Sequence, residues 1–183
     1  MHWMMLLLAK NPKKQEKLFK EVSEVLKGRN ATYDDFSKLS YALSCLKESL
    51  RIHSPIKGVV KKSLEKCILD NKEFPKDTQF KIEFQTVHLD EKLWKNPEEF
   101  EPERFLEISN PIHFIPFSYG KRNCIGYKFA EIEGTIILTT IIQKYSIHLK
   151  EGIDISKYED EVTFATSTPK YDSPFILKKR KNF

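Results

Sequence analysis

The feature that most constrains this chain is a ten-residue stretch, Phe117 to Gly126, that leads into a long apolar segment. The stretch contains one cysteine, Cys124, with an arginine two residues before it and glycines four before and two after. From residue 125 to residue 142 apolar side chains recur at helical spacing, which predicts a helix. A cysteine at the start of a helix lies where the macrodipole and free N–H groups stabilise negative charge. Such a thiol is suited to serve as a metal ligand or a nucleophile.

Taken alone, Cys124 permits two other interpretations. One is a buried cysteine that caps a core helix. The other is a catalytic nucleophile paired with a histidine such as His113 or His148. Both explain the cysteine only, and leave the phenylalanine, arginine and glycines around it without a role.

The full pattern Phe117-x-x-Gly120-x-Arg122-x-Cys124-x-Gly126 resembles the haem-binding signature of the cytochrome P450 family. The resemblance implies that Cys124 is the thiolate axial ligand of the iron in haem b, iron protoporphyrin IX. Phe117 would pack beside the sulfur and limit solvent, and Arg122 would pair with a haem propionate. The two glycines would let the backbone bend and approach the porphyrin without a side-chain clash. No further catalytic residue is assigned in this chain.

A second signature lies in a predicted helix from about residue 36 to residue 53. Glu48 and Arg51 are three residues apart and so share one helix face, which by itself favours a surface ion pair of small energetic weight. In the family that it resembles, such a pair is buried beneath the haem and joined by a further arginine. The resemblance implies that this arginine is Arg104, in the segment Phe100-x-Pro-Glu-Arg-Phe105, and that Glu48, Arg51 and Arg104 form a structural network.

Weak alternation between residues 57 and 84 predicts short strands of a small antiparallel sheet. The segment departs from the family pattern at one point, because an arginine expected to reach a haem propionate is replaced by Lys61 or Lys62. Lysine keeps the charge but loses the bidentate geometry. Further strands are expected over residues 146–150, 162–168 and 175–178.

The expected fold is mainly α with small antiparallel β-sheets, equivalent to the C-terminal part of the cytochrome P450 fold. With 183 residues, one domain is expected. We divide it into a helical part (1–56), a small sheet with the Pro-Glu-Arg-Phe loop (57–105), the cysteine loop with its helix (106–143) and C-terminal strands (144–183). The resemblance also implies that the chain begins partway through the family's domain, so that the oxygen-activating acid–alcohol pair is absent.

Composition limits the kinds of binding partner and the cellular compartment that can be expected. The net charge of +5 comes from lysines spread among acidic residues, which favours a solvated surface over a nucleic-acid site. No run of about 18 apolar residues occurs, so no membrane anchor is expected in this chain. Three unpatterned cysteines indicate a reducing intracellular compartment. If the full-length parent is a typical eukaryotic member, the resemblance implies the endoplasmic reticulum membrane surface.

By resemblance, the function is that of a haem-binding oxidoreductase that monooxygenates a lipophilic small molecule, using O2 and electrons supplied by a reductase. Lys121, Arg122 and Lys128 flank the ligand loop and predict a basic proximal face for this redox partner. The alternative is a non-catalytic truncated remnant, or a partner-binding module, that lacks the oxygen-activating half.

Overall fold

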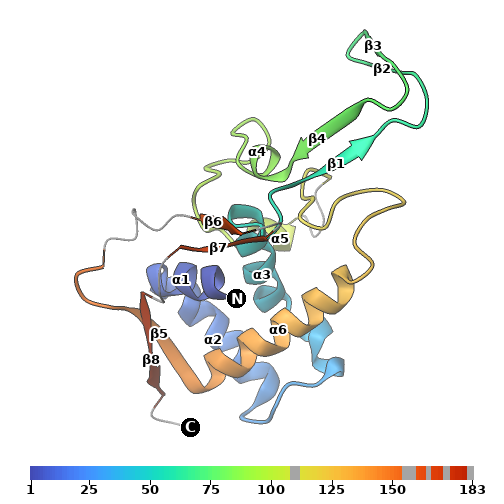
Figure 1. The fold of residues 1–183 in the computed structure, drawn as a ribbon. Coiled ribbons are helices and arrows are strands. Elements are labelled where there is room, and N and C mark those ends of the chain that lie inside the picture. The colour runs from blue at the N-terminus through green and yellow to red at the C-terminus, as the bar shows by residue number, and fades with distance from the viewer. Residues whose placement is uncertain (108–111, 154–159, 164–165, 171–173, 181–183) are drawn as a thin grey trace.

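The structure is a computed structural model that describes residues 1–107, 112–153, 160–163, 166–170 and 174–180. Its helices are α1 (His2–Lys10), α2 (Pro12–Leu26), the 3-10 helix η1 (Tyr33–Lys38), α3 (Ser40–Ile52), α4 (Phe84–His88), α5 (Arg104–Glu107) and α6 (Tyr127–Lys144). Its strands are β1 (Gly58–Lys62), β2 (Cys67–Leu69), β3 (Lys72–Phe74), β4 (Gln79–Glu83), β5 (Tyr145–Leu149), β6 (Asp160–Thr163), β7 (Thr166–Pro169) and β8 (Phe175–Lys179). The prediction of a mainly α fold with small antiparallel sheets is confirmed (Figure 1).

Local sequence signals set the helix boundaries. Pro12 occupies the first turn of α2, where its missing N–H costs nothing, and separates this helix from α1. The helix α2 ends where Lys27 adopts a left-handed conformation (φ 50°). The carboxylate of Glu21 in α2 then accepts hydrogen bonds from the backbone N–H groups of Tyr41 and Ala42, at 2.7 and 2.9 Å. A side chain of one helix thus satisfies the free donors at the start of α3.

The core lies where α1, α2, α3 and α6 pack together. In α2, three apolar side chains spaced four residues apart form one buried stripe: Leu18, Val22 and Leu26. They share a cluster with apolar residues of α3 and α6, among them Ala42, Cys45, Leu138 and Ile142. The apolar periodicity of the chain therefore packs the C-terminal half of the long helix α6 against α2 and α3.

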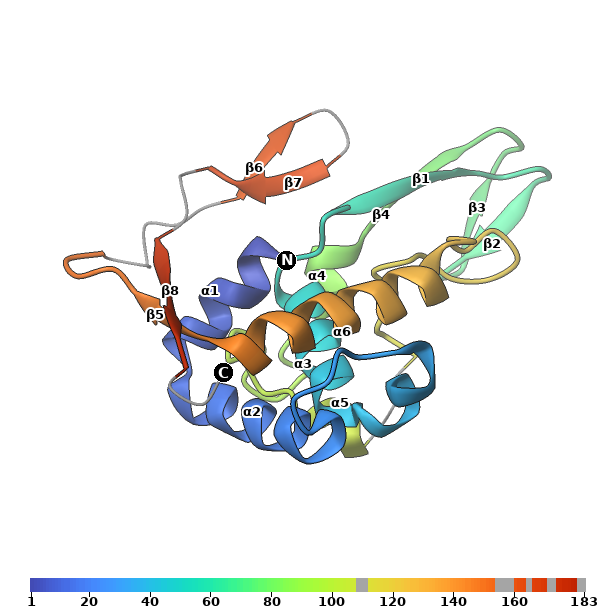
Figure 2. The same cartoon turned by 90° about the horizontal axis from the view of Figure 1, so that it is seen from below.

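Within the described residues the strands form four separate two-stranded antiparallel sheets: β1–β4, β2–β3, β5–β8 and β6–β7. The pair β1–β4 projects from the helices and carries the short pair β2–β3 at its tip (Figures 1 and 2). Figure 2 also shows that α6 runs from the loop beside this hairpin to the pair β5–β8. The loop just before α6 therefore lies beside the projecting hairpin, with residues 119–125 exposed.

Two details differ from the sequence-based expectation. The predicted strand over residues 162–168 is instead the pair β6–β7, with residues 164 and 165 outside the described part of the chain. The predicted helix over residues 36–53 is divided, because Leu39 (ψ 51°) separates η1 from α3. Among the helices of the described residues, none has the length and apolarity needed to cross a bilayer.

Candidate functional site

The segment from Phe117 to Gly126 folds as a loop closed by its own backbone. The N–H of Cys124 donates to the carbonyl of Phe117 at 2.9 Å, and the N–H of Asn123 donates to the carbonyl of Gly120 at 3.1 Å. Gly120 has a φ of +86°, a conformation that a residue with a Cβ rarely adopts. The loop therefore requires glycine at this position and presents Cys124 three residues before the first residue of α6.

The cysteines of the chain differ sharply in exposure. Cys124 is exposed, whereas Cys45 in α3 is fully buried and its burial raises the pKa of its thiol. The interpretation of Cys124 as a buried cysteine in a helix cap is therefore wrong. Its sulfur is accessible to a ligand.

Cys124 borders an apolar hollow with a volume of about 370 Å³. Its lining combines the thiol and one guanidinium with apolar side chains from α3, β1, α4 and the loop: Leu50, Pro55, Ile56, Val59, Phe84, Pro116, Phe117, Ser118, Arg122 and Cys124. A ligand that suits this lining has a large apolar body, a metal that binds thiolate and an anionic group for the guanidinium. The residues present thus fit a thiolate-ligated haem.

Three of the five predicted haem-contacting residues lie at this hollow, whereas Gly120 and Gly126 are not part of its lining. Phe117, Arg122 and Cys124 line it directly. Arg122 is exposed and forms no ion pair with any residue in the described part of the chain, so its guanidinium is available for an anion. A Cβ added to Gly126 would lie 3.9 Å from the sulfur of Cys124, which is an ordinary contact distance. Contact with the sulfur therefore does not require glycine at position 126, whereas the positive φ of the turn favours glycine at position 120.

The alternative of a cysteine–histidine nucleophile finds no support in the geometry. The ring of His113 packs edge-on against Trp94, with centroids 4.4 Å apart. The ring of His148 lies in β5 and shares a hydrogen bond with the hydroxyl of Ser146 at 2.8 Å. Both histidines are thus engaged elsewhere, and neither hydrogen-bonds the thiol of Cys124 in the described residues.

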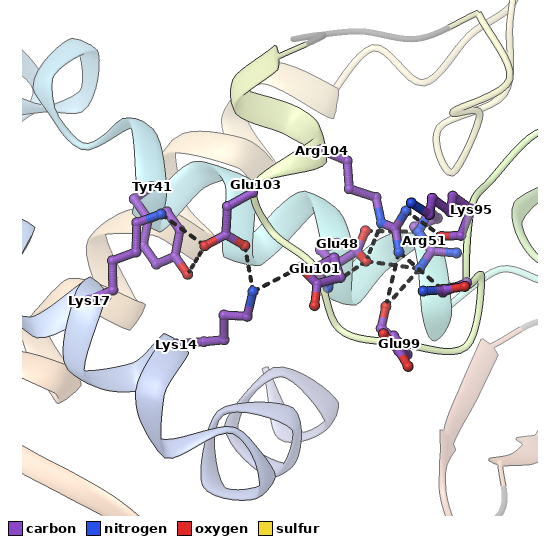
Figure 3. Close-up of polar contacts among 11 residues, drawn as sticks. Lys14, Lys17, Tyr41, Glu48, Arg51, Lys95, Glu99, Glu101, Glu103 and Arg104 are labelled. Carbon is purple, nitrogen blue, oxygen red and sulfur yellow. Dashed lines mark hydrogen bonds and ion pairs between the residues drawn. The ribbon is translucent and has the colours of Figure 1, made fainter.

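Glu48 and Arg51 are fully buried, so the alternative of a surface ion pair is wrong for them. Arg51 donates to both carboxylate oxygens of Glu48, at 2.8 and 2.9 Å. Arg104 reaches the same carboxylate at 2.9 Å (Figure 3). The structure therefore brings together the three residues of the predicted network. Buried charges of this kind are tolerated only when each is paired and hydrogen-bonded.

The network continues toward α2. The backbone N–H of Glu101 donates to Glu48 at 2.9 Å, and the side chain of Glu101 pairs with Lys14 at 2.8 Å. Lys14 also pairs with Glu103, which Lys17 contacts as well (Figure 3). Burial acts to raise the pKa of Glu103, but the hydrogen bonds from both lysines hold it below its usual value. The segment before α5 is thus tied to α2 and α3 by charged side chains.

The predicted basic face is less uniform than the sequence suggests. Lys121 and Arg122 are exposed on the loop. Lys128 lies 3.5 Å from the buried carboxylate of Glu131, which also pairs with Lys47 of α3. Part of the charge of Lys128 is therefore balanced within the fold.

Neither Lys61 nor Lys62 lines the hollow; the β1 residue that does is Val59. Lys62 pairs instead with Asp77 at 2.8 Å, with both side chains exposed. The suggestion that one of these lysines replaces an arginine at a haem propionate therefore gains no support from the geometry.

The sequence did not identify the walls of the hollow. Leu50 lies between Glu48 and Arg51 in α3, but the motif formed by those two residues assigns it no role. Ile56 precedes β1, Val59 lies in β1 and Phe84 is the first residue of α4, and the weak alternation of this segment gives no reason to single them out. They come together beside the cysteine through tertiary packing, in which α4 contacts both α3 and β1.

The family model for "Cytochrome P450" matches residues 1–175 of the chain. The chain belongs to the cytochrome P450 family. It is 37% identical over 181 residues to the "Cytokinin hydroxylase" of Arabidopsis thaliana, covering 96% of this chain and 34% of that relative. It is 36% identical over 153 residues to the human "Cytochrome P450 4F8", covering 79% of this chain and 29% of that relative.

A further relative is the "Probable cytochrome P450 508A1" of Dictyostelium discoideum, 33% identical over 160 residues, covering 86% of this chain and 33% of that relative. The chain thus spans about a third of the length of the curated relatives that it matches. Cytochrome P450 proteins use haem, and in general a redox partner and a lipophilic substrate.

Proposed function

We propose that this cytochrome P450 chain binds haem b through Cys124 and takes part in the monooxygenation of a lipophilic small molecule. One observation carries the proposal. The exposed thiol of Cys124 and the guanidinium of Arg122, which has no ion-pair partner among the described residues, border the same apolar hollow. A metal ligand, an anion partner and an apolar wall thus meet in one place.

Each side chain has a defined task in this proposal. The thiolate of Cys124 would hold the iron, and Arg122 would hold a propionate. Phe117, half-buried at the entry of the loop, would keep water from the sulfur. The apolar side chains of Val59 and Phe84 would face the porphyrin and the substrate. When bound, the haem would supply the oxidation, the insertion of one atom of O2 into the substrate.

Electrons would come from a reductase that docks at a basic proximal face. Lys121 and Arg122 supply its exposed charges, and Lys128 contributes less because Glu131 lies beside it. Charge complementarity across such an interface raises the association rate, and salt screens it. The rate of reduction should therefore fall as ionic strength rises, and a rate independent of salt would contradict this part of the proposal.

The proposal extends to the substrate class and the location of the whole protein. Relatives carry names such as "Cytokinin hydroxylase" and "Leukotriene-B4 omega-hydroxylase 3", which are names of hydroxylases. We propose a lipophilic substrate for the whole protein, a reducing intracellular compartment, and the endoplasmic reticulum membrane surface as its location.

A second candidate is a partner-binding module without turnover. It is favoured by the exposure of two apolar side chains next to the ligand loop: Ile125 is 102% exposed and Phe129 is 68% exposed. Exposed apolar groups of this size commonly mark a surface that another chain covers.

The spectrum of the reduced protein with carbon monoxide separates the two candidates. A thiolate-ligated haem gives a red-shifted Soret band, which we expect from the wild type after haem reconstitution. Cys124→Ala should abolish the band, whereas Cys67→Ala, at a half-buried cysteine on the hairpin tip, should leave it intact. Failure of the wild type to take up haem would favour the partner-binding module, and a band that survives Cys124→Ala would exclude Cys124 as the ligand.

A further inference from the structure

His88, at the end of α4, is a fully buried histidine that lies between the charged network and the cysteine loop. Its ring packs near Phe84 on one side and Phe114 on the other, with centroids 6.5 and 5.7 Å away. A histidine enclosed by aromatic rings is most simply a neutral core residue. Two hydrogen bonds give it a more specific position.

The first bond runs toward the cysteine loop. The backbone N–H of Ile115 donates to Nε2 of His88 at 3.0 Å. Because Nε2 accepts, the neutral ring carries its proton on Nδ1, which is buried and has no hydrogen-bond partner. An unsatisfied buried N–H is unfavourable, so the ring is held in this orientation at a cost to stability.

Ile115 is the point at which the cysteine loop is fixed. Its carbonyl accepts a hydrogen bond from the N–H of Ser118 at 3.0 Å, while its own N–H is held by His88. Phe117 follows two residues later, and its carbonyl accepts the bond that closes the loop at Cys124. Both polar groups of Ile115 thus set the direction in which the chain enters the loop.

The second bond runs toward the charged network. Arg51 donates from Nη1 to the backbone carbonyl of His88 at 2.7 Å, while its other nitrogens hold Glu48. A continuous set of contacts therefore runs from Glu48 through Arg51 and His88 to Ile115. It joins the buried charges to the backbone that presents the thiol.

We propose that His88 is a positioning residue: its Nε2 holds the N–H of Ile115 and thereby transmits the position of the Glu48–Arg51 pair to the cysteine loop. The haem role of that loop rests on the proposed function, but the positioning of the loop by His88 does not require bound haem. Removing the acceptor should release the loop while the helices stay folded.

Amide hydrogen exchange of the full chain without haem tests the positioning directly. His88→Met removes the acceptor, and His88→Gln, with a side chain of the same length, restores an acceptor oxygen. The protection of Ile115 should fall about tenfold in His88→Met and return to nearly the wild-type value in His88→Gln. His113→Met, which alters a neighbouring ring outside the contact, should leave it unchanged. The amide of Gln15 in α2 reports whether the fold is intact.

Three results of the exchange experiment would contradict the proposal. Equal protection of Ile115 in His88→Met and wild type, no recovery in His88→Gln, or the same loss in His113→Met would overturn the proposal. If the methionine variant does not fold, His88→Asn takes its place, because its shorter side chain cannot reach Ile115 and should show the same loss.

A spectrum of the reconstituted protein then addresses the haem. If the wild type binds haem, His88→Met should show a larger fraction of the carbon monoxide complex without the red-shifted band than His88→Gln, and equal fractions would overturn the link to the thiolate. If the wild type binds no haem, the proposed function fails while the exchange result still decides the role of His88.

Discussion

The buried network around Glu48 and the exposed loop around Cys124 lie in one small fold and are built in opposite ways. Glu48 and Arg51 have no exposed surface, and their charges are satisfied by other side chains and by backbone carbonyls. Cys124 is exposed, and its loop is closed by backbone hydrogen bonds alone. The charges of the first region are paired within the fold, whereas the guanidinium of Arg122 in the second has no ion-pair partner in the described part of the chain.

This difference separates support from function. Mutating a member of a charged network that is paired within the fold lowers the stability, because the remaining members are left buried and unpaired. An exposed thiol beside an apolar hollow contributes little to stability and is free to bind. Mutations in the first region should therefore act on folding, and mutations in the second should act on ligand binding.

The largest effect is expected for Glu48→Ala. The change leaves the guanidinium of Arg51 fully buried without its carboxylate and removes one partner of Arg104. We expect a loss of about 3–5 kcal/mol in the free energy of unfolding. Urea unfolding followed by circular dichroism measures it.

The matched control is Lys62→Ala, which breaks an ion pair with Asp77 in which both side chains are more than half exposed. Pairs of this kind contribute about 0–1 kcal/mol. Similar losses in the two variants would remove the contrast between the buried network and the surface.

The sequence predicted some of these features well and others not at all. The apolar spacing after Cys124 predicted a helix over residues 125–142, close to α6, because one buried stripe has a signature that is local in the chain. The burial of Glu48 and Arg51 is not local. A pair three residues apart looks the same on a surface, and here its burial depends on Arg104 and on the carbonyl of His88.

The hollow beside Cys124 was equally hidden. Its walls come from Leu50 in α3, Val59 in β1 and Phe84 in α4, which approach one another only through tertiary packing. The bond from Ile115 to His88 joins residues 27 positions apart. The resemblance to the cytochrome P450 family supplied the residues that are expected to contact the cofactor, whereas the residues that line the hollow and hold Ile115 could be found only from the fold.

The link between the two regions should show in the pH dependence of stability. Burial, together with the positive charge of Arg51 and smaller effects of His113 and Lys57, lowers the pKa of His88 to about 4 from 6.5. The folded state therefore keeps the ring neutral while the unfolded chain takes up a proton. The stabilisation is complete above pH 6.5 and is lost as the pH falls toward 4, by about 3 kcal/mol in total.

Urea unfolding at a series of pH values measures this loss in the wild type and in His88→Gln. Carboxylates titrate over part of the same range but do so in both proteins, so the difference between the two curves isolates the histidine. Parallel curves would show that His88 is not held neutral by the fold.

A smaller effect is expected at the wall of the hollow. A Cβ added to Gly58 would lie 2.4 Å from the carbonyl oxygen of Ile82 across the β1–β4 pair, so the backbone would have to shift. We expect Gly58→Ala to lower the free energy of unfolding by about 1–3 kcal/mol. Val60→Ala, at an exposed position of the same strand, should have a much smaller effect. Equal effects would mean that the close contact is relieved by a small adjustment of the hairpin.

The smallest effect on stability, and the sharpest on ligand binding, is expected for Cys124→Ser. The side chain is exposed, so the free energy of unfolding should change by less than about 0.5 kcal/mol. The same variant should lose the red-shifted band of the reduced carbon monoxide complex, since a hydroxyl does not replace the thiolate.

The control, Cys45→Ser, should have the opposite effects. It places a hydroxyl in the core and should lower the free energy of unfolding by about 1–3 kcal/mol, while the red-shifted band is kept because Cys124 is unchanged. A large loss of stability in Cys124→Ser would show that the loop supports the fold as well as presenting the thiol, and the separation of the two regions would not hold.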